Sequence, residues 1–504
     1  MSYLVFSSRH RWALALLGLL AAVLLGIAGG WLVATAGALL TAALVIGAVA
    51  GVWVLRDVEA AYLAILAIIC LLPFGALPLP FSPKPTFLDL VVLALFVVWL
   101  ARLATGKQRE LIATPLGLPV VIFFGLAVAT FVIGLGHASL DKSVARRFAE
   151  LLASILLYFI TVNAVRDVGR LQRLTRVFIL LAAAAAVVAI VLYVLPDGTS
   201  YSLLLRLQRV GYYPEGGAIL RYIRDDPSLS QRATGTSVDP NALGGLLMIA
   251  LGVSAPQLFA RARLFPAWLC AGLTGVMGLA LVLTFSRASM GGVALALVIL
   301  AALRYRRLGL ILAVTAAAVL ILPWTQAYVL HSFEGLQWHD LSSQMRLGEY
   351  KDAFILIQRY PLLGVGFVAS PDIDTYLKVA SVYLAIAARM GLVGLASFLA
   401  IAAVFFINAA RAWGGGVISE ELEPLWWGYQ VAVTAALVGG ILDHYFFNLD
   451  FHHAVTLFWV MLGLASASSR LVQDEMRERR PGGEGRDTAK AAEDDRRLPF
   501  RGII

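Results

Sequence analysis

Charged residues are scarce in this sequence. Asp, Glu, Lys and Arg make up 14 % of the 504 residues, whereas hydrophobic residues make up 60 %. A water-soluble domain carries about a quarter charged and about half apolar residues. The composition therefore excludes a single soluble globular domain, because one core could not hide so much apolar surface from water.

Cysteine is also rare. The two cysteines, Cys70 and Cys270, each lie inside an apolar run. We expect both to pack as small hydrophobic side chains rather than to form a disulfide. No solenoid-type repeat is visible along the chain, so neither a disulfide scaffold nor a repeat architecture is predicted.

Long apolar runs, by contrast, recur along almost the whole length. About twenty apolar residues are needed to cross roughly 30 Å of hydrocarbon as a helix, and a helix satisfies its own backbone groups in lipid. We predict an all-α integral membrane protein, a polytopic bundle of about 12–14 transmembrane helices, the uncertainty coming from apparent breaks at Gly29 and Arg287. The predicted spans are 12–28, 31–54, 60–74, 88–104, 117–136, 148–164, 177–195, 241–260, 266–286, 288–303, 308–323, 380–407, 426–442 and 454–469.

Lys and Arg gather in alternate connections between these spans. If the N-terminus lies inside, the basic clusters all fall on the cytoplasmic side, as the positive-inside rule requires. We expect a protein of the cytoplasmic (inner) membrane with both termini in the cytoplasm and an uncleaved first helix. The net charge of +9 then belongs to these loops, and no nucleic-acid partner is predicted.

This orientation divides the chain into six segments and places both long connections outside. Loops of this length are where binding residues concentrate, so we expect the site on the external face. The segments are N-terminal transmembrane helices (1–195), a first long external loop (196–239), central transmembrane helices (240–323), a second long external loop (324–379), C-terminal transmembrane helices (380–470) and a disordered cytoplasmic tail (471–504).

Arginine occurs where the positive-inside rule disfavours it. Arg232 and Arg346 lie in the two external loops, and Arg287 interrupts the nearly continuous apolar stretch 266–303. Long loops translocate regardless of charge, and Arg287 could extend to the headgroups, so solvated arginines are the simpler interpretation. Arginine, however, binds phosphate bidentately and stays charged when partly desolvated. The three arginines together predict a clamp for a diphosphate on a lipid.

The segment that follows Arg232 contains a helix start. Asp239 precedes Pro240, and an Asp before a Pro at the first helical position is typical of an N-cap. A helix N-terminus also favours an anion. Capping by itself accounts for Asp239.

Several short motifs occur in the order found in the O-antigen ligase and polymerase superfamily, which this chain resembles over roughly residues 230–400. The match rests on the order of the fragments and on their shared side of the membrane. The fragments are Arg232…Gly235…Asp239-Pro240-Asn241, Ser286-Arg287, Arg346, Tyr360-Pro361-Leu362-Leu363-Gly364-Val365-Gly366, Tyr383-Leu384 and Gly391-Leu392-Val393-Gly394.

The resemblance implies a donor and a reaction. Members of that family take a glycan linked to undecaprenyl diphosphate and transfer it to a sugar hydroxyl outside the cytoplasmic membrane. By resemblance, Arg232, Arg287, Arg346 and Asn241 would bind the donor, with Arg287 also assisting catalysis, because neutralising the leaving diphosphate promotes its departure. No cofactor and no metal ion are implied. A chain-length regulator or a flippase is an implied partner.

The sequence departs from the family at one point. Ligases of this family carry a His-Asn pair where this chain has Ala380 and Ser381. Glu349 is our first candidate for the catalytic base, although an ordinary i,i+3 pair with Arg346 would equally explain it. Asp372 and Asp374 are later choices.

The turn at 443–453 contains three His and two Asp. Adjacent His residues on a turn rarely converge on one ion, so we predict no metal site there. Asp443 and His444, with Tyr383, are instead predicted to line an acceptor groove.

Three functions remain open. We favour polymerisation of lipid-linked oligosaccharide repeat units into a surface polysaccharide, because the ligase His is missing. An O-antigen ligase or a protein O-oligosaccharyltransferase would use the same donor and the same arginines. A transporter or flippase for an anionic solute or lipid predicts ionisable residues near mid-span, and most of the predicted spans contain none.

Overall fold

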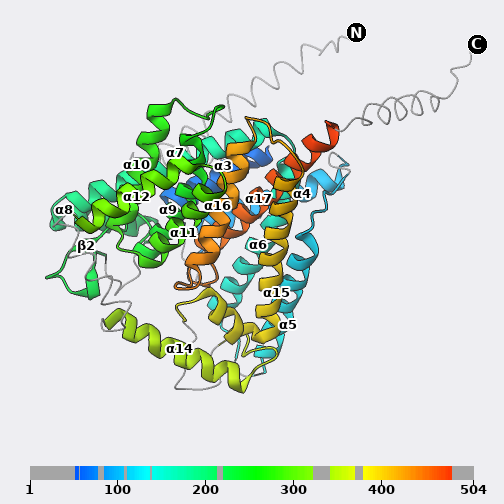
Figure 1. Ribbon diagram of the computed structural model, residues 1–504. Coiled ribbons are helices and arrows are strands. Elements are labelled where there is room, and N and C mark those ends of the chain that lie inside the picture. Colours follow the sequence, from blue (N-terminus) through cyan, green and yellow to red (C-terminus); the bar gives the residue numbers. More distant parts are fainter. Residues whose placement is uncertain are drawn as a thin grey trace, which may run out of the picture.

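The computed structural model describes residues 51–55, 57–77, 84–106, 110–136, 139–212, 219–321, 341–368 and 379–479. Within these ranges the chain is almost entirely helical (Figure 1). The predicted span 12–28, and the span 31–54 apart from residues 51–54, lie outside the described residues, as do Asp372 and Asp374.

The remaining predicted spans each coincide with a helix. The helices are α3 Val58–Leu71, α4 Phe87–Ala104, α5 Gly117–Gly134, α6 Lys142–Ala164, α7 Val168–Val194, α8 Asp197–Leu205, α9 Pro240–Ser254, α10 Ala267–Leu283, α11 Arg287–Leu303, α12 Arg306–Ile321, α14 Leu341–Arg359, α15 Val382–Gly414, α16 Glu423–Gly439 and α17 His452–Glu478. Short 3-10 helices are η1 Arg206–Val210, η2 Ile223–Asp225 and η3 Ala255–Leu258. Strands β1 Arg221–Tyr222 and β2 Gln231–Arg232 form a small antiparallel sheet in which Arg221 pairs with Arg232.

Seven of the described helices are long and apolar enough to cross a membrane, namely α4, α5, α6, α7, α9 continued by η3, α15 and α17. Helices α3, α10 and α11 are shorter apolar helices. The outer helices expose large apolar side chains, as in Leu93 of α4 (62 % exposed) and Leu118 of α5 (70 %). Such surface is suited to lipid rather than to water. The predicted all-α polytopic membrane fold is confirmed.

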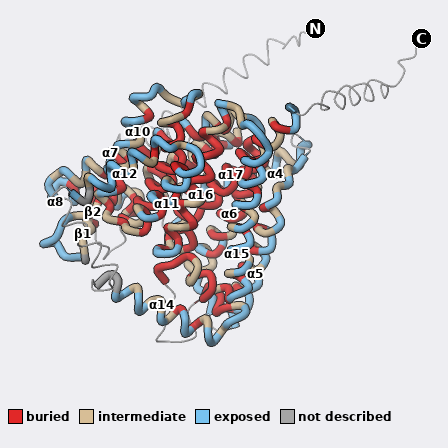
Figure 2. The backbone as a smooth tube through the Cα atoms, viewed as in Figure 1, coloured by how far each residue is buried: buried red, intermediate tan, exposed pale blue. Residues whose placement is uncertain are grey.

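Helices α9, α16 and α17 form the centre of the bundle, where almost every residue is buried (Figure 2). Hydroxyl groups join these helices to their neighbours. Ser154 Oγ lies 2.9 Å from Thr456 Oγ1, and Thr175 Oγ1 lies 2.7 Å from the Tyr429 hydroxyl. Hydrogen bonds of this kind stabilise helix packing in lipid, where hydrophobic burial contributes little. They fix α16 and α17, and hence the turn between them.

Helix α17 extends further than the sequence suggests. The expectation of a disordered tail from residue 471 does not hold for residues 471–478, which continue the helix to Glu478. Val472 is buried, Gln473 Nε2 donates to Asn408 Oδ1 (3.1 Å), and the Ser419 amide donates to Glu475 Oε2 (3.4 Å). These contacts with α15 and the segment after it stabilise the extra turns.

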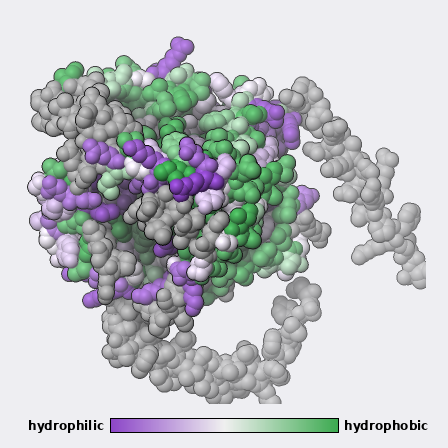
Figure 3. Space-filling model, turned by 90° about the horizontal axis from the view of Figure 1, so that it is seen from below, coloured by the Kyte–Doolittle hydropathy of each residue, from purple (hydrophilic) through white to green (hydrophobic). Residues whose placement is uncertain are grey.

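Helix α14 lies across one end of the bundle, at the bottom of Figure 1. We call this end the α14 face. Figure 3 looks onto it and shows hydrophilic side chains across its middle and hydrophobic surface toward one edge. Helix α8 and the β1–β2 sheet both belong to the connection between α7 and α9.

The motif 360–366 docks against a break in α15. Gly391 interrupts the helix with φ +67° and ψ −175°. The Leu392 amide donates to the Pro361 carbonyl (2.7 Å). A Cβ on Gly391 would overlap the Leu362 carbonyl, and Gly364, at φ +66°, would meet Arg389 in the same way. Only glycine adopts such a backbone and permits so close an approach.

Substitution Gly391→Ala is expected to destabilise the protein. The backbone conformation of Gly391, φ +67° and ψ −175°, is essentially confined to glycine and costs about 1–3 kcal/mol for a residue with a Cβ. The overlap with Leu362 adds to this cost. We expect a lower unfolding temperature in detergent, measured by intrinsic tryptophan fluorescence. Gly278→Ala is the matched control, because a Cβ there meets no atom within 4 Å. Equal unfolding temperatures for the two variants would contradict the docking described above.

Candidate functional site

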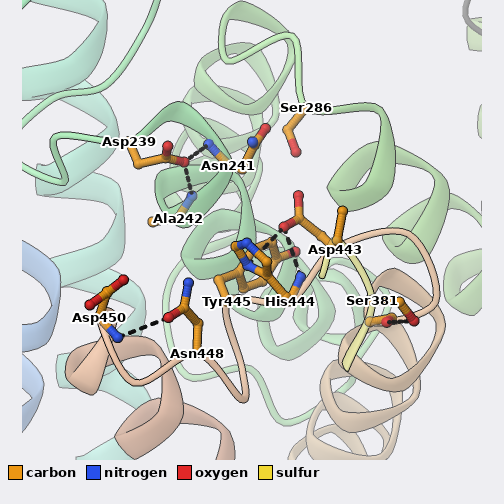
Figure 4. A network of polar contacts seen from close by, with 12 residues as sticks. Asp239, Asn241, Ala242, Ser286, Ser381, Asp443, His444, Tyr445, Asn448 and Asp450 are labelled. Carbon is orange, nitrogen blue, oxygen red and sulfur yellow. Dashed lines mark hydrogen bonds and ion pairs between the residues drawn. The ribbon is translucent and has the colours of Figure 1, made fainter. Parts of the chain in front are cut away.

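Residues of the start of α9, the α10–α11 junction and the α16–α17 turn lie close together in Figure 4. In all, four segments of the chain bring polar side chains together at the α14 face. They are β2 with the start of α9, the junction of α10 and α11, the middle of α14, and the turn between α16 and α17. These segments are far apart in the sequence. Most of the predicted site residues belong to them.

Arg232 is held in a largely buried position. Its Nε donates to the Thr284 carbonyl (2.9 Å), and an Nη atom donates to Asn241 Oδ1 (2.8 Å). Burial lowers the pKa of Arg232, while the nearby carboxylates of Asp239 and Asp443 raise it. A guanidinium remains charged under these conditions. Arg232 is therefore a fixed cation, and Asn241 orients it.

Asp239 caps α9, as the sequence predicts. Its Oδ1 accepts from the amides of Asn241 (2.7 Å) and Ala242 (3.1 Å). An Nη atom of Arg221 lies 3.7 Å from Asp239 Oδ2. The cap places Asn241 in the first turn of α9, within reach of Arg232.

Arg346 and Asp443 link α14 to the α16–α17 turn. An Nη atom of Arg346 lies 3.8 Å from Asp443 Oδ2, and the Asp443 side chain is only 5 % exposed. Burial raises the pKa of Asp443, while His444 and Arg346 lower it. His444 Nδ1 lies 3.6 Å from Asp443 Oδ1, which accepts from the His444 amide (2.8 Å).

Glu349 attaches α14 to the segment before α15. Its Oε2 accepts from the Ala380 amide (3.0 Å), and the Tyr350 hydroxyl donates to the Ala380 carbonyl (3.1 Å). Burial raises the pKa of Glu349, and its bond to the Ala380 amide lowers it. The i,i+3 pair of Glu349 with Arg346 is not among the ion pairs of the described residues. Glu349 thus positions the segment before α15, a role that the sequence does not reveal.

The position of the family's missing histidine lies beside the α16–α17 turn. The Val382 amide donates to the carbonyls of Gly440 (2.8 Å) and Asp443 (3.1 Å), and Ser381 Oγ donates to the Gly440 carbonyl (3.4 Å). Ala380 and Ser381 therefore adjoin the turn that carries His444. His444 of the α16–α17 turn therefore lies near the position at which ligases of the family carry their histidine.

Arg287 is the first residue of α11 and lies at the junction of α10 and α11. Thr284, which binds Arg232, lies three residues before it. Ser289, two residues after it, contacts the Tyr445 hydroxyl (3.0 Å). Arg287 therefore begins its helix between two residues that contact the rest of the cluster.

Tyr383 does not join this cluster. Its hydroxyl donates to the Leu437 carbonyl (2.8 Å), and its ring lies edge-on to Phe398 at 5.8 Å. Phe446 and Phe458 line the same small space. The side chain thus packs among α15, α16 and α17 rather than in a polar groove, because its hydroxyl finds a backbone acceptor there.

A second polar cluster was not predicted from the sequence. Asp89, Arg146, Glu150 and His452 meet near the other end of the α16–α17 turn. They come from α4, α6 and α17. The His-rich turn at 443–453 was the one local signal, and nothing in the sequence connects it to Asp89 or Glu150.

Together, the fold and the site define a multi-pass membrane protein with a polar site of arginines and a buried carboxylate at one end. Residues 272–399 match the family model described as O-antigen ligase, which confirms the resemblance to the O-antigen ligase and polymerase superfamily over that region. The matched region contains Arg287, Arg346 and Glu349, and it implies a membrane enzyme of glycosyl transfer. The comparison with curated proteins finds no match.

Substitution of Glu349 tests how α14 is held. Glu349→Ala leaves the buried Ala380 amide without its acceptor, which costs about 1–3 kcal/mol, whereas Glu349→Gln retains an acceptor oxygen. We expect Glu349→Ala to increase hydrogen–deuterium exchange in residues 341–368 and Glu349→Gln to leave it near wild type. Lys351→Ala, on the exposed side of α14, is the control. Unchanged exchange in Glu349→Ala would show that other contacts hold the helix.

Proposed function

We propose that this protein is a membrane glycosyltransferase that polymerises oligosaccharide repeat units linked to undecaprenyl diphosphate into a surface polysaccharide. The observation that carries the proposal is the gathering of arginines at the α14 face. Arg232 is held by Asn241 and the Thr284 carbonyl, and Arg346 lies 3.8 Å from the buried Asp443. The family match to residues 272–399 supports glycosyl transfer as the reaction.

We place the α14 face outside the cytoplasmic membrane and both termini in the cytoplasm. Basic side chains at loops predicted as cytoplasmic support this orientation. Arg102 pairs with Asp57 (3.2 Å), and Arg170 and Arg173 pair with Glu59 (3.3 and 2.6 Å). Such clusters favour the cytoplasmic side.

Arg232, Arg287 and Arg346 bind the donor diphosphate in this proposal. Arg232 is already oriented by Asn241 and by the Thr284 carbonyl, so little reorganisation is needed when the ligand arrives. Preorganised cations stabilise the charge that grows on a leaving diphosphate. The arginines supply this charge themselves, and the proposed step requires no metal ion.

The reaction is a single displacement. The oxygen of an acceptor hydroxyl bonds to the anomeric carbon of the donor glycan while the bond from that carbon to the phosphate oxygen breaks. Lipid diphosphate leaves with the bonding electron pair, and the hydroxyl proton passes to a base. Attack opposite the leaving group inverts the configuration at the anomeric carbon.

We assign the base to His444, with Asp443 as its positioning residue. Histidine suits proton transfer near neutral pH, and the Asp443 carboxylate lies 3.6 Å from His444 Nδ1. Glu349, our first candidate from the sequence, is occupied by the Ala380 amide. Its role in this proposal is to position Ala380 and Ser381 beside the turn.

A ligase or a protein O-oligosaccharyltransferase would use the same donor site. The absence of the ligase His-Asn pair at Ala380 and Ser381 favours the polymerase. The acceptor distinguishes these enzymes. Elongation of lipid-linked glycan by the purified protein supports the polymerase, whereas transfer to lipid A core or to protein alone would exclude it.

The arginine clamp is tested with purified enzyme and a lipid-diphosphate oligosaccharide. We expect Arg232→Lys and Arg346→Lys to lower kcat/KM by about 10²-fold or more, since lysine keeps the charge but loses the bidentate contact. Arg287→Lys is expected to behave likewise. Lys351→Ala, which removes an exposed charge from the same helix as Arg346, should retain full activity. Full activity in all three arginine variants would exclude the clamp.

The assignment of the base is tested by two variants in the same assay. Loss of a general base lowers the rate by about 10²–10⁴-fold. We expect such a loss in kcat for His444→Ala, with the KM for donor little changed, and less than a tenfold loss for Glu349→Gln. The opposite pattern would assign the base to Glu349.

A further inference from the structure

A cavity of about 290 Å³ lies at the other end of the α16–α17 turn. This is close to the lower limit of small-molecule pockets, about 300 Å³. The cavity is bounded by the segment after α3, the start of α6 and the start of α17. Its polar lining includes Arg146, Arg147, Glu150, Asp450 and His452. None of these residues has a part in the proposed diphosphate site.

The same short turn supports both sites. Asp443 and His444 lie at its beginning, and Asp450 lies near its end, as Figure 4 shows. The rings of His444 and Phe451 are 6.4 Å apart, and those of Phe451 and His453 are 5.9 Å apart. The cavity is thus connected to the proposed base through neighbouring side chains.

The charges around the cavity are paired with one another. Arg146 contacts Asp89 Oδ2 and Glu150 Oε1, each at 2.6 Å, and Arg147 contacts Asp450 Oδ1 at 2.6 Å. His452 Nδ1 lies 3.3 Å from Asp89 Oδ1 and 4.0 Å from Glu150 Oε2. These pairs hold donors and acceptors in fixed directions around the cavity.

His452 Nδ1, 3.3 Å from Asp89 Oδ1, makes no hydrogen bond within the residues that the structure describes. The same holds for the two Nε2 nitrogens of His452 and His453, and His453 is 95 % buried. Buried polar atoms in proteins are almost always hydrogen-bonded. A ligand with several hydroxyl groups would satisfy both Nε2 nitrogens.

The chemistry of the cavity favours a sugar over a cation. Ligand atoms of Asp89, Glu150 and His452 lie within 4.8 Å of one another, a spacing that a metal ion could use. Arg146, however, already pairs with both carboxylates, and a divalent ion beside its guanidinium would be repelled. The Phe74 ring, 4.8 Å from that of His453, adds an apolar wall of the kind that packs against a sugar ring.

We propose that this cavity is the acceptor subsite, which binds a sugar residue of the acceptor glycan near the hydroxyl that attacks the donor. The inference rests on the proposed function. Donor and acceptor then bind at opposite ends of one rigid turn. This arrangement orients the two substrates toward each other and reduces the entropic cost of their reaction.

The subsite is tested by binding and by kinetics. The binding probe is the oligosaccharide released by mild acid from the lipid-linked donor, titrated calorimetrically into the full-length protein in detergent. We expect His452→Ala to weaken binding and to raise the KM for acceptor, each at least tenfold, with the KM for donor unchanged. His452→Gln and Phe74→Leu are second variants, in case His452→Ala does not fold. Lys142→Ala, exposed on α6, is the control.

The outcomes separate this inference from the proposed function. Wild-type binding and acceptor KM in folded His452 and Phe74 variants would overturn the acceptor subsite while the transferase remained. Stoichiometric binding of Mn²⁺ or Zn²⁺ that His452→Ala abolishes would also overturn it in favour of a cation site. Arg232→Ala should lose transfer but keep oligosaccharide binding. Oligosaccharide binding without any transfer from the lipid-linked donor by wild type would contradict the proposed function alone.

Discussion

A carboxylate buried at the end of a membrane bundle requires a positive charge nearby, and Asp443 is that carboxylate here. Its side chain is 5 % exposed, and Arg346 approaches it from α14. An unpaired charge in this position would be costly. The pairing therefore holds the polar helix α14 against the turn between α16 and α17. Arg232 contributes a second positive charge from β2.

The turn around Asp443 is rigid because the helices on both sides are buried. Helices α16 and α17 lie in the centre of the bundle and are joined to α6 and α7 by hydroxyl contacts. A loop between mobile helices could not hold His444 and Asp443 in a fixed geometry. Catalytic groups require such fixation, since a small displacement removes much of their effect.

Several polar residues of the site act on the protein itself. Asn241 orients Arg232, Asp239 caps α9, and Glu349 binds the Ala380 amide. These contacts position the cations before a ligand arrives. In the proposed reaction this preorganisation matters more than the number of arginines, because a diphosphate in water is already well solvated.

The sequence by itself determined the features that depend only on residues close together along the chain. Apolar runs predicted the apolar helices between α3 and α17, but not α8 and α14, which lie in the segments predicted as long external loops. Asp239 before Pro240 predicted the start of α9. The unusual positions of Arg232, Arg287 and Arg346 also pointed to a polar site. Each of these signals follows from local chemistry, such as the length of a span, a helix cap, or a charge beside a lipid-facing segment.

Only the tertiary structure decided which residues meet. Tyr383 has a polar hydroxyl but bonds to the Leu437 carbonyl in the core, and α17 continues past residue 471 through contacts with Asn408. His444 lies in the turn beside Ala380 and Ser381, more than sixty residues away in the sequence. Asp89, Glu150 and His452 converge from three helices. Such approaches result from helix packing, which depends on many weak contacts between distant segments and leaves no pattern in any one of them.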